Sequence, residues 1–378
     1  MKTKTEPNRR GTVLVLTAAL IVFLLGLLAL SVDVGYLFVV RSELQRTADA
    51  GAVSAAWELI DESVLTGDGD PYVAIAAAEA KAAEYAAMNP VAKQSPGLGV
   101  DDTLVGYPAT PSDPNAQMTF DDPTRFNAVW VRAQRTATQN GEVPLFFAKV
   151  LGFDTQPLVA EATACFISNF GGFEAPSDGS NLDILPFALD LETWDGLLGG
   201  VGNDDWTWNE QLEQVEAGPD GILGVNLFPQ GTGSPGNRGT VDIGSSNTST
   251  ADIARQILYG ISQEDLAHHG GKLEFDENGE LFLNGDTGIS AGFKDELASI
   301  KGEPRIIPIF SEVTGPGNNA MYTIVRFVGI RIMEVKLTGP MSRKRVMVQP
   351  AKVITKGGIP ATGPPKSYFI YSPVWIVR

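Results

Sequence analysis

A long apolar run at the start of the chain dominates its pattern of hydrophobic and polar positions. Residues 12–32 contain no charged side chain, and Arg9, Arg10 and Asp33 flank them. A helix of this length rises about 31 Å, which is enough to cross a hydrocarbon core of about 30 Å. The run therefore predicts one transmembrane helix. Because basic residues stay on the cytoplasmic side of membranes, we expect a cytoplasmic N-terminus and an extracytoplasmic remainder.

The helical pattern continues beyond the apolar run. Small or apolar residues recur at every third or fourth position after Asp33, so they form one stripe along an α-helix. No proline or turn cluster interrupts residues 12–60. We therefore expect one continuous helix of roughly 70 Å, whose second half packs against the extracytoplasmic part. The stripe consists of Leu37, Val40, Leu44, Ala48, Gly51, Ala55 and Leu59.

A cleaved secretory signal is the alternative interpretation of the same run. Ala29-Leu30-Ser31 is an acceptable cleavage site with small residues at its two outer positions. However, the apolar core of a signal peptide spans only about 7–15 residues, and this run is longer. The helical pattern also continues past the site. We therefore expect an anchor that stays attached to the protein.

Residues 70–167 show the pattern of a second helix and a small sheet. Tyr72–Met88 consist almost entirely of strong helix formers and are bounded by proline on both sides. Asn127–Thr136 alternates as a strand does, and Leu158–Ile167, rich in Val, Ala and Thr, predicts a second strand. Between them, Pro144–Leu151 predicts a short amphipathic helix that begins at its proline.

Beyond residue 170 the composition shifts to short β segments separated by turn residues. Gly171–Ser180 is rich in glycine, serine and aspartate, and we interpret it as a linker. Tyr322–Val335 alternates over the longest distance and predicts the best-defined strand. The other β-rich segments are Ile222–Phe228, Gly236–Gly244, Arg305–Phe310, Arg345–Val353 and Tyr368–Val377.

Two local signals add a helix and a turn to this second part. Thr250–Ile261 carries its apolar residues on one helical face, and residues 248–250 offer candidate N-caps. Leu273–Phe275 and Leu281–Leu283 flank the pair Asn278-Gly279, which predicts a β-hairpin.

Composition and charge narrow the class of protein. Hydrophobic residues make up 43% of the 378 residues, so a packed core is expected. The net charge of −17 argues against binding to nucleic acid. Cys165 is the single cysteine, which rules out an intramolecular disulfide and predicts a buried, small hydrophobic side chain.

Candidate catalytic residues are few. The two histidines, His268 and His269, are adjacent, so their side chains point in different directions and rarely share one metal ion. No nucleophile elbow, P-loop, zinc-protease motif or Gly-x-Gly-x-x-Gly opening a helix accompanies them. We therefore expect no enzyme and no cofactor. A membrane-tethered hydrolase that uses one of these histidines is the less favoured alternative.

Acidic clusters raise a second alternative, a membrane-tethered adhesin-like module that binds Ca²⁺ or a glycan. Asp68–Asp70, Asp204-Asp205 and Asp276–Glu280 carry oxygen ligands, but none completes a calcium loop, and we favour solvated turns. Trp206 and Trp208 offer aromatic faces, for which packing is the favoured interpretation. We expect no metal site.

The N-terminal segment resembles the TadE/TadG-like family of Tad, or Flp-type, pilus-assembly membrane proteins. Three stretches carry the resemblance: Arg9-Arg10-Gly11, the segment from Val32 to Tyr36 (Val-Asp-Val-Gly-Tyr), and the segment from Leu44 to Ala52. It covers about residues 8–60 and extends more loosely to Asn169. The resemblance implies a pilin-like plan, in which a helix packs on a small sheet, and a role in pilus assembly.

Two features of related proteins are missing. Type IV pilins and some Tad pseudopilins carry glutamate five residues after the processing glycine, whereas Leu16 stands at that distance from Gly11. Larger family members carry a metal site of the type Asp-x-Ser-x-Ser. The nearest string here begins at Asp242 and lacks the middle serine. The resemblance therefore implies neither processing nor a metal.

These observations predict an α+β protein: a long N-terminal transmembrane helix, a pilin-like helix-on-sheet domain and a β-rich domain. The expected boundaries are 1–32 for the cytoplasmic tip and anchor, 33–170 for the pilin-like domain and 181–378 for the β-rich domain. We expect a single-pass inner-membrane protein of structural or pilus-assembly type that contacts lipid and other pilus-assembly or envelope proteins. Its oligomeric state stays open. The expected anchor and interaction stripe consists of Asp33, Leu37, Leu44, Ala48 and Leu59.

Overall fold

The computed structural model divides the chain into two compact units. Unit 1 comprises Met1–Leu59, Ile75–Cys165 and Trp375–Arg378, and unit 2 comprises Ile60–Ala74 and Phe166–Val374. The three-part division expected from the sequence, with an anchor that ends at residue 32, stays a prediction. The residues described are 10–60, 65, 70–108, 116–228, 238–245, 248–286, 290–315 and 319–377.

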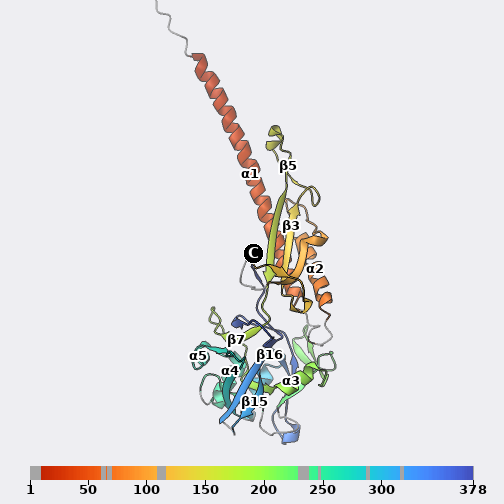
Figure 1. Ribbon diagram of the computed structural model, residues 1–378, viewed down its shortest axis with the longest axis vertical. Helices are drawn as coiled ribbons and strands as arrows, with labels where there is room; N and C mark the ends of the chain where they lie inside the picture. Colours follow the sequence, from red (N-terminus) through yellow and green to blue (C-terminus); the bar gives the residue numbers. More distant parts are fainter. Residues whose placement is uncertain are drawn as a thin grey trace, which may run out of the picture. The chain divides into compact units, whose positions relative to one another are not determined.

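Unit 1 begins with one continuous helix, α1 (Arg10–Glu58), of 49 residues (Figure 1). It confirms that the apolar run and the stripe beyond it form a single helix, except that the last stripe residue, Leu59, lies just after its end. Within the described residues, α1 is the one helix long and apolar enough to cross a membrane. Its apolar side chains over residues 13–28 are exposed rather than packed on the rest of the chain.

A five-stranded antiparallel sheet forms the body of unit 1. Its strand order is β2-β1-β3-β6-β22, and the central pair β3 and β6 runs in register from Ala128 opposite Cys165 to Arg135 opposite Leu158. The two expected strands and the expected alanine-rich helix are confirmed. The bounds are α2 (Pro71–Met88), β1 (Thr103–Pro108), β2 (Met118–Thr119), β3 (Ala128–Arg135), β6 (Leu158–Cys165) and β22 (Trp375–Ile376).

The second half of α1 packs on the centre of this sheet. Gln45 donates a hydrogen bond to the carbonyl of Glu161 in β6 (2.9 Å). A Cβ added at Gly51 would lie 3.3 Å from the carbonyl oxygen of Ala82 in α2 and 3.4 Å from the Val131 side chain in β3. The three elements therefore meet at Gly51, where small residues permit close approach.

The short connections of unit 1 differ from expectation at one place. Residues 144–151 were expected to form one short helix, but Val143–Pro144 forms β4, and only Ala148–Leu151 forms a single turn of 3-10 helix, η4. β4 pairs with β5 (Thr155–Gln156) and thereby closes a loop. The other short helices here are η2 (Val100–Asp102) and η3 (Pro123–Arg125).

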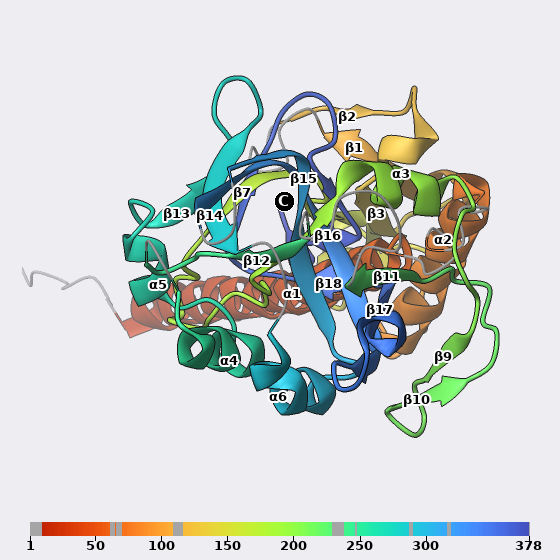
Figure 2. The same ribbon diagram turned by 90° about the horizontal axis from the view of Figure 1, so that it is seen from below.

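Unit 2 is built around a β-barrel (Figure 2). The strands β16, β14, β12, β8 and β15 pair in this order, and β15 pairs again with β16, so the ring closes. β17 and β11 extend the sheet from the second half of β16. The bounds are β8 (Phe187–Asp190), β11 (Val225–Phe228), β12 (Gly239–Val241), β14 (Leu281–Asp286), β15 (Pro304–Thr314), β16 (Ala320–Lys336) and β17 (Arg345–Pro350).

Helices and smaller sheets surround the barrel and enclose two clusters of buried side chains. One cluster centres on Trp194, Phe187 and Phe293, and the other on Phe173, Phe327 and Tyr322, so apolar burial stabilises both. The helices are α3 (Leu191–Leu198), α4 (Thr250–Tyr259), α5 (Gln263–Ala267), α6 (Lys294–Ser299), η5 (Ala291–Phe293) and η7 (Met341–Arg343). The remaining strands are β7 (Phe170–Glu174), β9 (Trp206–Asn209), β10 (Gln214–Ala217), β13 (Lys272–Glu274), β18 (Val353–Ile354), β19 (Gly358–Pro360), β20 (Ser367–Tyr368) and β21 (Ile370–Tyr371).

Several expected elements of this part are confirmed. Helix α4 starts at the N-cap Ser249, which lies within the expected residues, and it buries Ile253 and Ile257. The long strand expected over Tyr322–Val335 is β16, which has 17 residues. Of the strand expected over Gly236–Gly244, residues 239–241 form β12, whereas residues 236 and 237 lie outside the described part.

Two expectations for this part were wrong. The first half of the expected linker is strand β7, which pairs with β13 and β19 in a three-stranded sheet. The turn around Asn278-Gly279 does form, but its flanking strands do not pair as a hairpin. β13 pairs with β7, and β14 pairs with β16 and β12. Both flanking strands bury a leucine in the same cluster, so pairing with distant strands wins over the local turn.

Candidate functional site

The predicted stripe faces the chain's own sheet. Leu44 and Ala48 are fully buried, Asp33 is 2% exposed, and Leu37 and Leu59 are half-buried. Four of the five lie on one side of α1, which packs on β3 and β6, and Leu59 follows just after the end of the helix. Within unit 1 these side chains therefore hold the helix to the sheet.

The opposite side of α1 is open. Phe38 is 68% exposed and Val39 is 55% exposed, and a Cβ added at Gly35 would meet nothing within 4 Å. Ser42 and Arg46 continue this exposed face. Because the helix repeats every 3.6 residues, this face lies opposite the buried stripe. In the described part of unit 1, this face therefore carries apolar side chains that another protein can reach.

Asp33 ties the end of the apolar run to a loop more than a hundred residues further along the chain. One carboxylate oxygen accepts the backbone N–H of Phe146 (2.7 Å), and the other accepts those of Phe147 (2.9 Å) and Ala148 (2.6 Å). Backbone N–H groups that lead into a helical turn are unsatisfied donors, and a carboxylate is a strong acceptor for them. The ring of Tyr36 adds an edge contact to Phe146, with centroids 5.1 Å apart.

The loop held by Asp33 presents apolar side chains to the surroundings. Val150 is 89% exposed and Leu151 73% exposed, and Phe146, Phe147 and Phe153 are exposed as well. This feature was not predicted from the sequence, because the apolar residues of Pro144–Leu151 suggested the buried face of a helix. The available signal was the position of these residues: a surface loop between two paired strands rarely carries so many large apolar side chains.

A second carboxylate, Asp102, ties the segment before β1 to the neighbouring strand β3. Asp102 is 1% exposed and accepts hydrogen bonds from Gly99 N (2.7 Å), Arg132 Nε (2.8 Å), Gln134 Nε2 (2.9 Å) and Gln139 Nε2 (2.5 Å). Burial alone would raise the pKa of Asp102, but the bonds from Gly99, Gln139 and Arg132 outweigh it and lower the pKa. This carboxylate stays charged and holds the loop before β1.

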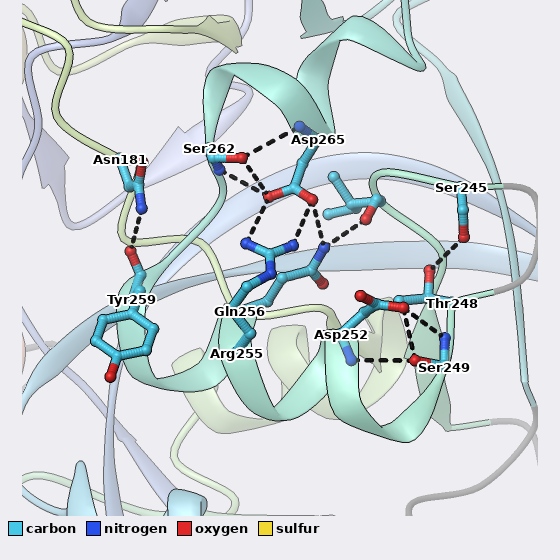
Figure 3. A network of polar contacts seen from close by, with 11 residues as sticks. Asn181, Ser245, Thr248, Ser249, Asp252, Arg255, Gln256, Tyr259, Ser262 and Asp265 are labelled. Atoms are coloured by element: carbon cyan, nitrogen blue, oxygen red, sulfur yellow. Dashed lines mark hydrogen bonds and ion pairs between the residues drawn. The ribbon is translucent and has the colours of Figure 1, made fainter.

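A polar network in unit 2 joins α4 to α5 (Figure 3). Asp265 receives both terminal nitrogens of Arg255, at 2.6 and 3.1 Å, and the backbone N–H and hydroxyl of Ser262. Gln256 approaches the same carboxylate at 3.3 Å. Burial opposes ionisation of Asp265, but the bonds from Arg255 and Ser262 outweigh it and lower its pKa. Both carboxylate oxygens of Asp265 are engaged in the helix cap and the ion pair, so this residue has a structural role.

The candidate catalytic and thiol residues are not assembled into a reactive site. Burial and the neighbouring His268 lower the pKa of His269, so its imidazole is neutral near pH 7. Asp242 accepts Thr248 N (2.9 Å) and Asn284 Nδ2 (2.9 Å), so both carboxylate oxygens are engaged. Cys165 is buried, and burial raises the pKa of its thiol to about 12. A protonated thiol is a poor nucleophile.

Asp204, Asp276 and Trp208, which belong to the binding alternative, make contacts within the chain. Asp204 accepts the N–H groups of Asp220 and Gly221, and Asp276 accepts those of Asn278 and Glu280. The Trp208 ring lies against Gly302 and 4.6 Å from the Arg331 guanidinium. Residues 68 and 69 lie outside the described part. Among the described residues, no group of three or more His, Cys, Asp and Glu side chains is arranged to hold a metal ion.

Comparison with known proteins adds two matches to this geometry. Residues 11–58, which coincide with α1, match the Flp pilus-assembly TadE/G-like family. Residues 54–164, which run from the end of α1 to the end of β6, match the Tad-like Flp pilus-assembly family. No curated protein and no solved structure matches the chain.

Proposed function

We propose that the protein is a membrane-anchored assembly component of a Flp-type pilus, because residues 11–58 match the TadE/G-like Flp pilus-assembly family and residues 54–164 match the Tad-like one. The observation that carries the proposal is α1. Its first half exposes apolar side chains over a length that suits a bilayer, and its second half packs on a sheet. A helix divided in this way joins a membrane to a folded domain.

The proposed orientation places the N-terminus in the cytoplasm and the folded units outside the inner membrane. Arg9 and Arg10 precede the apolar run, and Asp33 is the first charged residue after it. The positive-inside rule supports this direction. The net charge of −17 suits a soluble extracytoplasmic body, which anionic lipid repels.

The proposed contact with other pilus-assembly proteins uses the exposed face of α1. The predicted stripe, including Leu44 and Ala48, is occupied by the sheet of unit 1. Phe38 and Val39 on the opposite face remain accessible to a helix of a second protein. We infer that the stripe fixes the helix and that the opposite face meets the partner. The role of unit 2 is to present an extracytoplasmic surface.

The first test is the mass and location of the protein made in its own host. An intact N-terminus in the inner-membrane fraction supports a permanent anchor. A chain that begins at Thr12 or just after Ser31 contradicts it. Orientation is tested in spheroplasts with a membrane-impermeant maleimide: a cysteine at exposed Phe120 should react, and one placed within residues 1–9 should not.

The second test concerns the partner. A photo-crosslinking amino acid at Phe38 should give adducts with other Flp pilus-assembly proteins when the pilus is being built. The same amino acid at Leu44 is the matched control, because this position is buried in the chain itself. Adducts from Leu44 and none from Phe38 would reverse the assignment of the two faces.

A further inference from the structure

We propose that the β4–β5 loop, residues 145–154, is a second membrane contact, whose exposed apolar side chains enter the bilayer surface where α1 leaves it. The proposal rests on the membrane anchor of the proposed function. It adds a lipid-binding site on the folded part of unit 1, formed by Phe147, Val150, Leu151 and Phe153.

The position of the loop along α1 is fixed by Asp33. Residues 12–32 fill a hydrocarbon core of about 30 Å, so Asp33 lies at the boundary with the headgroups. Its carboxylate accepts the N–H groups of Phe146, Phe147 and Ala148 at 2.6–2.9 Å. The loop backbone is therefore within hydrogen-bonding distance of the residue at which the helix emerges. In Figure 1, β5 lies alongside the middle part of α1.

The composition of the loop suits a lipid surface. Between Glu142 and Asp154 the only charged residue is Lys149, and Phe147, Val150, Leu151 and Phe153 are all exposed. Apolar and aromatic side chains with a lysine among them are typical of segments that lie in the membrane interface. The long Lys149 side chain can reach an anionic lipid phosphate while its stem stays among the acyl chains.

The loop is also held in shape. Val143 pairs with Gln156, Leu145 is buried and donates its N–H to the carbonyl of Asp154 (2.9 Å), and Gly152 closes the helical turn with a φ of +89°. A preformed loop loses little conformational freedom when it binds. Its exposed side chains are therefore presented to a surface rather than collapsed on the protein.

Lipid is the favoured partner of the loop, because the loop adjoins the apolar surface of α1. The exposed apolar surface of α1 over residues 13–32 and the loop meet at Asp33, so a bilayer that covers the first reaches the second. A groove on another pilus protein is the alternative occupant, and the experiment below separates the two. With two contact points, the bilayer would fix the tilt and rotation of α1, which a single helix leaves free.

The test uses the full-length protein in vesicles of phosphatidylethanolamine and phosphatidylglycerol. A fluorescent NBD probe is attached to one cysteine at a time, at Leu151, at Phe120 or at Leu24. Cys165 is buried, so an added surface cysteine is labelled selectively. Phe120 is the matched control, because it is also an exposed, large apolar residue. It directly follows Thr119, which pairs with Tyr107 at the end of the sheet opposite to the β4–β5 loop. Lipids with a nitroxide near the headgroup or at the far end of the chain act as quenchers.

We expect the nitroxide near the headgroup to quench the Leu151 probe several-fold more than the Phe120 probe, at a depth of about 5–10 Å. The Leu24 probe should respond most to the nitroxide at the chain end. Quenching at Leu24 with none at Leu151 overturns the loop proposal and leaves the anchor intact. Absence of quenching at Leu24 overturns the anchor and the loop proposal together.

A second variant shows whether the apolar side chains cause the insertion. Val150→Asp with Leu151→Asp changes exposed positions only, so the midpoint of unfolding should not move. A probe at Phe153 should then lose most of its quenching by lipid nitroxides. A blue-shifted Phe153 probe that lipid nitroxides never quench indicates a protein surface and overturns the assignment to lipid.

Discussion

Asp33 shows how much one side chain adds to an otherwise apolar segment. Its carboxylate binds three N–H groups that lie 113 to 115 residues further along the chain. Each charge-assisted bond is about twice as strong as a neutral one, and losing an acceptor leaves the donors unsatisfied. The residue therefore couples the end of the apolar run to the folded part of unit 1.

Asp33→Asn should loosen the β4–β5 loop without unfolding unit 1. The amide retains one acceptor oxygen and turns its NH₂ group toward the backbone donors, so we expect the local free energy of opening to fall and the loop amides to exchange several-fold faster. Hydrogen exchange in nanodiscs should be faster at the amides of Phe146, Phe147 and Ala148. Asp49→Asn is the control, because Asp49 accepts a single side-chain bond, from Gln45. Equal protection in both variants would contradict the role of Asp33.

Asp102 should make the stability of unit 1 depend on pH. Its pKa is lowered in the folded protein from the usual 3.8 because its hydrogen bonds outweigh burial. The stabilisation is therefore complete above about pH 4 and is lost as pH falls through the folded-state pKa. Asp102→Asn should be less stable than the parent at pH 7, and this difference should shrink toward pH 3 in urea unfolding. A difference that stays constant with pH would contradict this account.

At the scale of elements, α1 serves two environments with one helix. The first half exposes apolar side chains on all its faces, as a membrane span does, whereas the second half has one buried and one exposed face. The buried face uses small residues, so helix and sheet approach closely at Gly51 and Ala52. The stripe read from the sequence is therefore an intramolecular contact, and its role toward partners stays a prediction.

Leu44→Asp should disturb the packing of the second half of α1 and leave the first half unaffected. Aspartate at this fully buried position leaves a charge without a partner, which costs about 3–5 kcal/mol of unit 1 stability. Insertion into the membrane should be unchanged, because residues 12–32 are untouched. Limited proteolysis of the membrane fraction should cut unit 1 readily. Ser42→Asp, on the exposed face of the same helix, is the control and should resist as the parent does.

In the whole molecule, each folded unit is built from segments that are not consecutive in the sequence. The last strand, β22, pairs with β6 of unit 1, although residues 166–374, which precede it, belong to unit 2. Trp375 lies opposite Cys165, and Val377 donates its N–H to the carbonyl of Thr163 (2.8 Å). The C-terminus is therefore an edge strand of the first folded unit.

Ending the chain at Val374 should weaken unit 1 selectively. The loss of β22 exposes the edge of β6, and we expect unit 1 to lose about 1–3 kcal/mol, as for a few backbone hydrogen bonds. Hydrogen exchange should rise in β6 (Leu158–Cys165) and stay unchanged in the barrel strand β16. Faster exchange in β16 alone would contradict the assignment of the last residues to unit 1.

The sequence by itself determined the features that depend on local periodicity. The apolar run and the stripe share one helical period without a proline, so α1 was predicted over its full length. Helix α2, the N-cap of α4 and the strands β3, β6 and β16 follow from propensity and alternation in the same way. Each of these signals lies within the segment that it predicts.

Tertiary structure alone decided which segments meet. The turn at Asn278-Gly279 forms without a hairpin, Gly171–Glu174 joins a sheet, and β22 pairs with β6 across the sequence. Asp33 likewise finds its partners in a loop that the sequence presented as a helix. Strand pairing and carboxylate contacts depend on what the whole chain can bury together, and no local pattern contains that information.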